Sequence, residues 1–276
     1  MGHDKLRKFA ENETFSCLLQ PSAEGLLDRR SGVPGLHLLP HSIRGHWNEK
    51  MFDAPRPIVL ELGCGKGDYT IALAERHPEC NYIGVDIKGA RLWKGAKYAT
   101  EHALGNVAFL RTRIEFIGAF FASGEVSEIW LTFSDPQMKS ENSRLTSPLF
   151  LERYRGFLAP GGRVHLKTDS RFLYEYSLAT ARANGLTVLC ADTDIYRHAE
   201  VSDRHSGLVP ESFPPDLLTV QTFYEKMFLE MGLPITYLSF LLDREEEFVH
   251  PEFDADYWRS AEGPRRTFSH HPAPKR

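Results

Sequence analysis

A glycine-rich turn between an apolar run and a helical pattern is the first stretch of the chain that could do chemistry. The run Ile58–Leu62 is typical of a buried parallel strand, and residues 68–75 carry apolar side chains at helical spacing. Between them lie Gly63, Gly65 and Gly67. A strand, a glycine turn and a helix in this order bring backbone N–H groups against a ligand. The G-x-G-x-G spacing differs from the G-x-G-x-x-G of dinucleotide sites and disfavours a nicotinamide dehydrogenase.

Acidic side chains close several of the later apolar runs. Asp86 ends the second run, where an acid in a nucleotide-binding α/β fold accepts hydrogen bonds from ribose hydroxyls. Asp135 and Asp169 follow the fourth and fifth runs. Because the carboxyl ends of parallel strands meet at one edge of a sheet, we expect these acids, the glycine turn and residues 112–114 to share one cleft. We expect Glu61 and Asp86 to hold a cofactor there.

The elements that must position these residues alternate along the chain, which predicts an α/β fold with a doubly wound, mostly parallel sheet. The predicted strands are residues 58–62, 81–86, 106–110, 128–133, 163–168, 186–190 and 235–242. Residues 192–218 are predicted to form a long irregular connection. We divide the chain into an N-terminal arm, residues 1–57, a domain, residues 58–242, and a polar C-terminal tail, residues 243–276, that we expect to be largely mobile.

Composition narrows the class of protein. The 276 residues are 42% hydrophobic and 25% charged, which is a globular composition, and the net charge of −4 argues against a protein that simply coats nucleic acid. The 4 cysteines form no CxxC pair, so a reducing cytoplasm is the expected location. No apolar run is long enough to span a membrane, so we expect no membrane association. His37 and His41 are separated by Pro40, which makes a metal site there improbable, and we expect none.

Two sets of residues carry a resemblance to known enzymes. The turn E-x-G-x-G-x-G from Glu61 to Gly67, with Asp86 closing the second strand, resembles S-adenosylmethionine-dependent methyltransferases of the Rossmann-like class I. That resemblance implies a seven-stranded sheet whose last strand is antiparallel, with helices on both faces. The ordered series Phe-Ser-Asp-Pro-Gln-Met-Lys at 133–139, Arg-Leu at 144–145, Thr-Asp at 168–169 and Thr-Phe-Tyr-Glu at 222–225 is similar to the signatures of the bacterial tRNA (guanine-N7-)-methyltransferases. The resemblance covers about residues 58–242.

The chain departs from the pattern of that family at four places. Ser134 stands where the family usually has proline, and Gln137 where it usually has tryptophan. The basic run after the lysine is thin, with the sequence Ser-Glu-Asn-Ser-Arg at 140–144, and Arg113 replaces an acidic residue at the end of the third strand. The thin basic run and the net charge of −4 favour an alternative, a methyltransferase of the same fold that acts on a small molecule or a protein.

The resemblance implies methyl transfer from S-adenosylmethionine to N7 of a guanine in the variable loop of tRNA, at position 46. Guanine N7 carries a lone pair and no proton, so the reaction needs alignment and electrostatic support more than a strong base. We assign Asp135 as the catalytic residue, because a carboxylate there could accept from guanine N1–H and the exocyclic amine. The expected cofactor-binding residues are Glu61, Gly63, Gly65, Gly67, Asp86, Thr112, Arg113, Ile114 and Asp135. The expected substrate-binding residues are Lys139, Arg144, Asp169, Thr222 and Glu225.

Each of these residues also has a purely structural interpretation. Asp86 and Asp169 could cap the helices that follow them, and Asp135 could be a plain turn residue before proline. Lys139 and Arg144 could be solvated surface charges, and Thr222 and Glu225 could be a helix-capping pair. A non-catalytic protein that binds nucleic acid or cofactor is a further alternative. The sequence does not distinguish a monomer from a homodimer.

Overall fold

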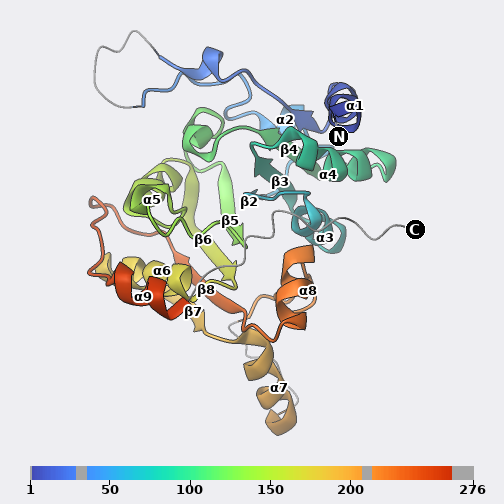
Figure 1. The fold of residues 1–276 in the computed structure, drawn as a ribbon. Coiled ribbons are helices and arrows are strands. Elements are labelled where there is room, and N and C mark those ends of the chain that lie inside the picture. Colours follow the sequence, from blue (N-terminus) through green and yellow to red (C-terminus); the bar gives the residue numbers. More distant parts are fainter. Residues whose placement is uncertain (1, 29–35, 207–212, 263–276) are drawn as a thin grey trace.

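The computed structural model describes residues 2–28, 36–206 and 213–262, and within these ranges eight strands form one sheet. The strands are β1 (Leu18–Leu19), β2 (Ile58–Leu62), β3 (Asn81–Asp86), β4 (Val107–Arg111), β5 (Val126–Thr132), β6 (Leu158–Thr168), β7 (Val188–Asp192) and β8 (Thr236–Leu241). Their order across the sheet is β1-β4-β3-β2-β5-β6-β8-β7 (Figure 1). Strand β8 runs antiparallel to both of its neighbours, β6 and β7, and the other pairs are parallel.

This topology confirms the predicted α/β class and the antiparallel last strand, but the predicted number of seven strands was too low. The additional strand is β1, in the segment predicted to be an arm. It is only two residues long, and it adds to the edge of the sheet by pairing with Phe109 and Leu110 of β4. A strand this short leaves no alternating pattern from which it could be recognised.

Helices cover both faces of the sheet. The α-helices are α1 (Gly2–Asn12), α2 (Trp47–Lys50), α3 (Asp68–Arg76), α4 (Gly89–Glu101), α5 (Pro148–Arg155), α6 (Arg171–Ala183), α7 (Ile195–Ser206), α8 (Phe223–Glu230) and α9 (Ala255–Glu262), and the 3₁₀ helices are η1 (Glu24–Leu26), η2 (Ile114–Ala119) and η3 (Glu141–Ser143). Buried side chains of α3, α4 and α7 pack in one apolar cluster, and those of η2, α5 and α6 pack in another. The sheet therefore separates two cores, as the doubly wound pattern requires.

Two segments differ from what the sequence predicted. The connection 192–218 contains the helix α7, although residues 207–212 lie outside the described part of the chain. The C-terminal tail is not simply mobile: residues 243–262 include α9, which packs on α6, while residues 263–276 lie outside the described part. Both helices are polar overall, so a polar composition was a poor guide to them. At the other end of the chain, α1 packs on α4.

Among the described residues, no helix combines the length and the apolar character needed to cross a bilayer.

Candidate active site

The three glycines of the turn after β2 all have left-handed backbone conformations, with φ of +82° at Gly63, +59° at Gly65 and +76° at Gly67. Their surroundings differ. A Cβ at Gly63 or Gly65 would meet nothing within 4 Å, whereas a Cβ at Gly67 would lie 2.6 Å from the ring of Phe109. Gly63 and Gly65 therefore leave open space for a ligand to approach the backbone, and Gly67 allows the start of α3 to pack against the sheet.

Asp86 lies at the carboxyl end of β3, beside this turn. Its side chain is buried and accepts hydrogen bonds from the backbone N–H groups of Gly65 at 3.0 Å and Lys88 at 2.7 Å. These contacts hold the carboxylate at the wall of a cavity, where it can accept from ligand hydroxyls. Asp86 is not the N-cap residue of α4, because Lys88 occupies that position. Asp86 does accept a hydrogen bond from the Lys88 N–H, so it supports the start of the helix.

Glu61, near the end of β2, is a buried acid with several donors. Its carboxylate accepts from the backbone N–H of Thr70 at 2.9 Å and from the hydroxyls of Thr70 and Thr132. Burial raises the pKa of Glu61 to about 7, and the hydrogen bonds from Thr132 and Thr70 oppose that rise. Glu61 lines a small cavity beneath the turn, so a cationic group bound there would favour its ionised form.

The loop after β5 presents Asp135 on a constrained backbone. The flanking residues Phe133 and Gln137 have φ of +50° and +47°, values that residues other than glycine rarely adopt. The Asp135 carboxylate accepts from the backbone N–H of Gln137 at 2.9 Å, and the Phe133 N–H donates to the Lys167 carbonyl at 2.9 Å. Strained backbone of this kind is concentrated at functional sites. Asp135 lies at the tip of this loop with its side chain exposed, where a ligand can reach it.

The carboxyl ends of the parallel strands meet around one cavity of about 690 Å³, as the sequence predicted. Of the expected residues, its lining contains Gly63, Asp86, Thr112, Arg113, Ile114, Asp135 and Asp169. The Arg113 guanidinium forms an ion pair with Glu115 at 3.1 Å, which leaves the backbone of residues 112–114 as the part of this loop best placed to recognise a ligand.

A second cavity of about 100 Å³ adjoins the first, because Gly63, Arg91, Phe133 and Tyr224 line both. It contributes Glu61, Gly65 and Thr222 from the expected set. Arg91 and Tyr224 are site residues that sequence reasoning missed. Tyr224 stands inside the motif at 222–225, and its aromatic side chain, 44% exposed, was a signal that could have identified it as a surface for a base to stack on.

Thr222 and Glu225 form a capping box at the start of α8. The Thr222 hydroxyl accepts from the Glu225 N–H at 3.1 Å, and the Glu225 carboxylate accepts from the Thr222 N–H at 3.3 Å. Glu225 is wholly buried and also contacts Nζ of Lys167 at 2.6 Å and the hydroxyl of Tyr196 at 2.7 Å. Glu225 lines neither cavity, so of this pair only Thr222 reaches the site. Glu225 is therefore a helix-capping residue, as the structural interpretation of the sequence allowed.

Arg144 and Lys139 also lie outside the lining of both cavities. Arg144 is buried, with its guanidinium over the rings of Phe172 at 4.7 Å and Tyr176 at 4.3 Å, and it donates to the Met138 carbonyl at 3.3 Å. A buried, stacked arginine secures the loop from within and is poorly placed to meet a phosphate. Lys139 is exposed at the end of the same loop.

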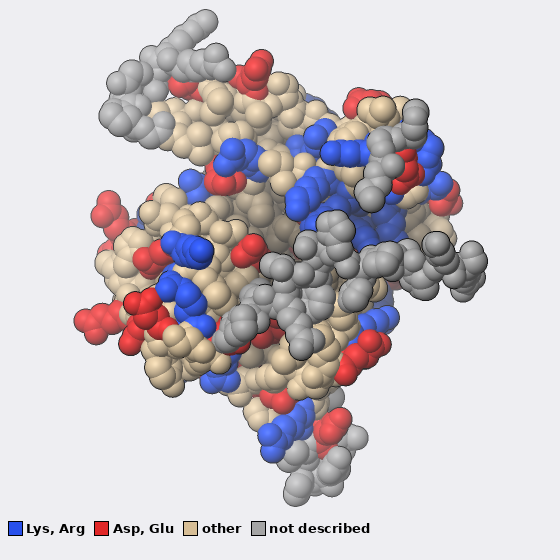
Figure 2. All heavy atoms as spheres, viewed as in Figure 1, with Lys and Arg blue, Asp and Glu red and all other residues tan. Residues whose placement is uncertain are grey.

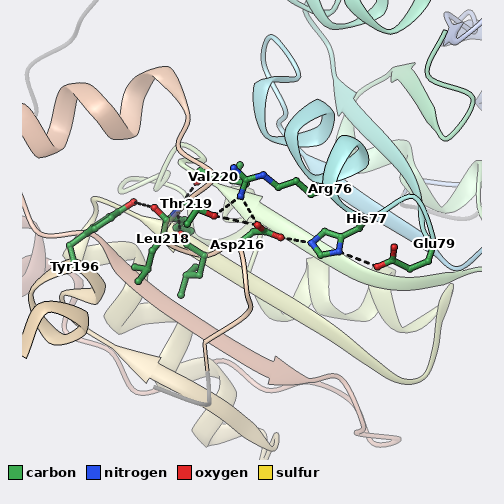
Figure 3. A network of polar contacts seen from close by, with 10 residues as sticks. Arg76, His77, Glu79, Tyr196, Asp216, Leu218, Thr219 and Val220 are labelled. Carbon is green, nitrogen blue, oxygen red and sulfur yellow. Dashed lines mark hydrogen bonds and ion pairs between the residues drawn. The ribbon is translucent and has the colours of Figure 1, made fainter. Parts of the chain in front are cut away.

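The segment before α8 is fastened to α3 by a polar network (Figure 3). Asp216 accepts from Arg76 at 2.5 Å and pairs with Nε2 of His77, whose Nδ1 contacts Glu79 at 3.0 Å. The hydrogen bond with Asp216 raises the pKa of His77. This network holds the chain that leads into Thr222 and Tyr224, so it supports the wall of the site from outside.

Exposed cations gather on one side of the cleft. Figure 2 shows Lys and Arg side chains concentrated where Figure 1 places α1, α3 and α4. Lys66, Lys88, Arg91 and Lys94 are exposed there, and the first three line one or both cavities. The basic character that the sequence lacks at 140–144 is therefore supplied across the cleft, next to the glycine turn.

Comparisons with known proteins show what the whole chain is similar to. A family model described as a putative methyltransferase matches residues 55–205. The tRNA (guanine-N(7)-)-methyltransferase of Bacteroides fragilis is 44% identical over 269 residues, which cover 97% of this chain and 98% of that protein. The protein of the same name from Christiangramia forsetii is 47% identical over 239 residues, 86% of this chain and 97% of the relative. Among solved structures, the 16S rRNA methyltransferase KamB has a TM-score of 0.51 at 15% identity and covers 74% of this chain and 95% of its own.

The sheet order, the glycine turn and the acid at the end of β3 define a class I methyltransferase, the class whose methyl donor is S-adenosylmethionine. Gly63, Gly65, Glu61 and Asp86 fit that cofactor, because they combine open backbone with carboxylates at the cavity wall. Within the class, the chain belongs to the tRNA (guanine-N(7)-)-methyltransferase family.

Proposed function

We propose that this protein transfers a methyl group from S-adenosylmethionine to N7 of a guanine in tRNA, and that the guanine is position 46 in the variable loop. The observation that carries the proposal is that Asp135 and Asp169 line the same cavity as the glycine turn and Asp86. Acceptors for a guanine thus stand beside the cofactor-binding half of the sheet. The names of the relatives support tRNA as the substrate.

The cofactor supplies an electrophilic methyl group on a sulfonium, and the residues of the chain bind the cofactor and align the guanine with it. We assign Gly63, Gly65 and the backbone of residues 112–114 to hold the cofactor, with Glu61 and Asp86 as its acidic partners. Asp135 accepts hydrogen bonds from guanine N1–H and the exocyclic amine, which aligns N7 and offsets the positive charge that develops on the base. Asp169 is a second acceptor.

In this proposal two groups of residues bind the tRNA. Lys139 and the exposed cations Lys66, Lys88 and Arg91 contact phosphates, whose contribution to binding falls with salt. Tyr224 and Thr222 contact the base or ribose at the mouth of the smaller cavity. A tRNA substrate supports a cytoplasmic location for the enzyme. The exposed cations that line one side of the cleft favour this substrate over the alternative of a small molecule or a protein.

The test is methylation of unmodified tRNA with labelled cofactor, followed by nucleoside analysis and mass spectrometry of nuclease fragments. We expect 7-methylguanosine in the fragment that contains the variable loop, and its loss when guanine 46 is replaced by adenine. Label on a different base would contradict the reaction. Label on N7 of a guanine elsewhere would retain the reaction and overturn the position.

A further inference from the structure

The C-terminal helix α9 makes a direct contact with the loop that carries Asp135. The Nη2 of Arg259 donates a hydrogen bond to the Met138 carbonyl at 2.9 Å. Met138 follows Gln137, one of the two residues with left-handed backbone beside Asp135. Arg259 therefore restrains the far end of a loop whose backbone is strained, at a point three residues from the proposed catalytic carboxylate.

The same helix contacts the loop that carries Asp169. The carboxylate of Glu262 accepts from the Ser170 hydroxyl at 2.8 and 2.9 Å and from the Phe172 N–H at 2.6 Å. These donors belong to the first turn of α6, directly after Asp169. A carboxylate at this end of a helix satisfies an N–H group that the helix leaves unbonded and is favoured by the helix dipole. Glu262 thus fixes the start of α6 and the orientation of the residue before it.

Arg259 and Glu262 can act together because residues three apart in a helix lie on the same face. The helix is itself held in place by the segment that leads to it. Phe253 packs edge-on against Phe172 at 5.3 Å and against Tyr176 at 5.4 Å, and Asn184 makes hydrogen bonds of 2.9 and 2.8 Å with the backbone of Val249. Figure 1 shows α9 alongside α6.

We propose that Arg259 and Glu262 are positioning residues for the methyl-transfer site: one face of α9 links the loop after β5 to the loop after β6 and so sets Asp135 and Asp169 relative to each other. The inference rests on the proposed function, since it assigns these two acids to the guanine. Neither residue lines either cavity, and neither belongs to the motifs that carry the resemblance to the family.

The contacts of α9 concern the geometry of the substrate half of the cleft and not the cofactor half. The cofactor half of the cleft is built on β2, β3 and β4, whereas the hydrogen bonds of Arg259 and Glu262 described above reach the loops after β5 and β6. Loss of the contacts should therefore lower turnover and leave cofactor affinity unchanged. A displacement of about 1 Å at a reacting group can lower the rate on the order of 100-fold. A loop that is loosened but still present should therefore lower kcat by less than that.

The experiment compares Arg259→Ala and Glu262→Gln with wild type in the full chain. We expect kcat at saturating tRNA to fall at least tenfold in each variant, with the Kd for S-adenosylmethionine within twofold of wild type. Arg259→Lys keeps a donor and the charge and should recover most of kcat. Arg182→Ala and Glu252→Gln remove an exposed arginine and an exposed glutamate from the same region and should match wild type.

Hydrogen exchange keeps the test decisive if a variant is less stable. The amides of Asp135, Gln137, Met138 and Lys139 should exchange faster in Arg259→Ala, while those of β2 and the glycine turn keep wild-type protection. Equal loss of protection everywhere would overturn the proposal in favour of a general stabilising role. Wild-type kcat in both variants would also overturn it. Asp135→Ala is measured in parallel: if that variant retains turnover, the proposed site fails, whereas normal α9 variants beside an inactive Asp135→Ala reject only the positioning role.

Discussion

Nζ of Lys167 lies 2.6 Å from Oε1 of Glu225, and both side chains are completely shielded from solvent. The lysine also donates to the Leu217 and Val220 carbonyls. This pair joins the central strand β6 to the first turn of α8, beside the aromatic residues at the mouth of the smaller cavity. Burial lowers the pKa of Lys167 and raises that of Glu225, and each partner opposes the shift in the other.

Removal of one member of this pair should strongly lower the stability of the folded protein. Glu225→Ala leaves a buried ammonium without its carboxylate, and we expect the free energy of unfolding to fall by about 3–5 kcal/mol. Urea denaturation followed by circular dichroism measures it. Glu230→Ala, an exposed glutamate on the same helix, is the control and should change stability by less than about 0.5 kcal/mol. A stable Glu225→Ala protein with weakened tRNA binding would instead return Glu225 to the substrate-binding set.

The glycines of the turn should respond differently to alanine. Gly63→Ala and Gly124→Ala both place a side chain at positive φ, +82° and +75°, with nothing within 4 Å, so each should lose about 1–2 kcal/mol of stability. Of these two glycines, Gly63 lines the cavities, so only Gly63→Ala should weaken S-adenosylmethionine binding. We expect a loss of at least about tenfold in affinity if the alanine side chain occupies space that the cofactor needs. Calorimetric titration compares the two. Equal cofactor affinity in both variants would argue against a cradle at Gly63.

Cofactor binding should depend on pH through Glu61. Burial raises its pKa to about 7, above the ordinary 4.5, so its contribution to apo-protein stability is complete below about 4.5 and is lost as pH rises through about 7. A cationic cofactor favours the ionised carboxylate, so affinity should rise with pH toward about 7 and level off above it. Titration in two buffers of different ionisation enthalpy should detect proton release in wild type and less release in Glu61→Gln. Identical release in both proteins would exclude Glu61 as the linked group.

The His77–Asp216 pair gives stability its own pH dependence. The pKa of His77 is raised by its hydrogen bond with Asp216, so its contribution is fully present below the ordinary value of 6.5 and is lost as pH rises through the raised folded pKa. We expect the urea midpoint of wild type to fall across that interval and His77→Gln to lack this part of the fall. His46→Gln, which alters an exposed pair with Glu49, serves as the control. A wild-type midpoint that stays level with rising pH would contradict the assignment.

The sequence predicted the site best where backbone pattern decides position. The glycine turn, Asp86, Asp135 and Asp169 all close parallel strands, and parallel strands bring their ends together whatever the side chains do. Arg144 and Glu225 were harder, because spacing does not show which way a long side chain points. The motif Thr-Phe-Tyr-Glu fits both a capping box and a ligand pair, and only packing shows that Glu225 turns inward to Lys167.

The contacts of the C-terminal segment could not be predicted for a different reason. Arg259 and Glu262 bind loops that lie 90 or more residues earlier in the chain, through a few hydrogen bonds that leave no periodic pattern in the sequence. Residues 243–262 are polar because only one side of the segment packs, with Phe253 as its apolar anchor. A polar composition therefore suggested mobility, although specific hydrogen bonds hold the segment in place.

The most direct test of the central claim is turnover by Asp135→Asn with unmodified tRNA and labelled S-adenosylmethionine, beside wild type. Asparagine preserves size but replaces one acceptor oxygen by a donor, so it cannot accept both guanine N–H groups. We predict formation of 7-methylguanosine by wild type, a fall of kcat of at least about 100-fold in Asp135→Asn, and an unchanged Kd for the cofactor. Wild-type kcat in Asp135→Asn would contradict the account.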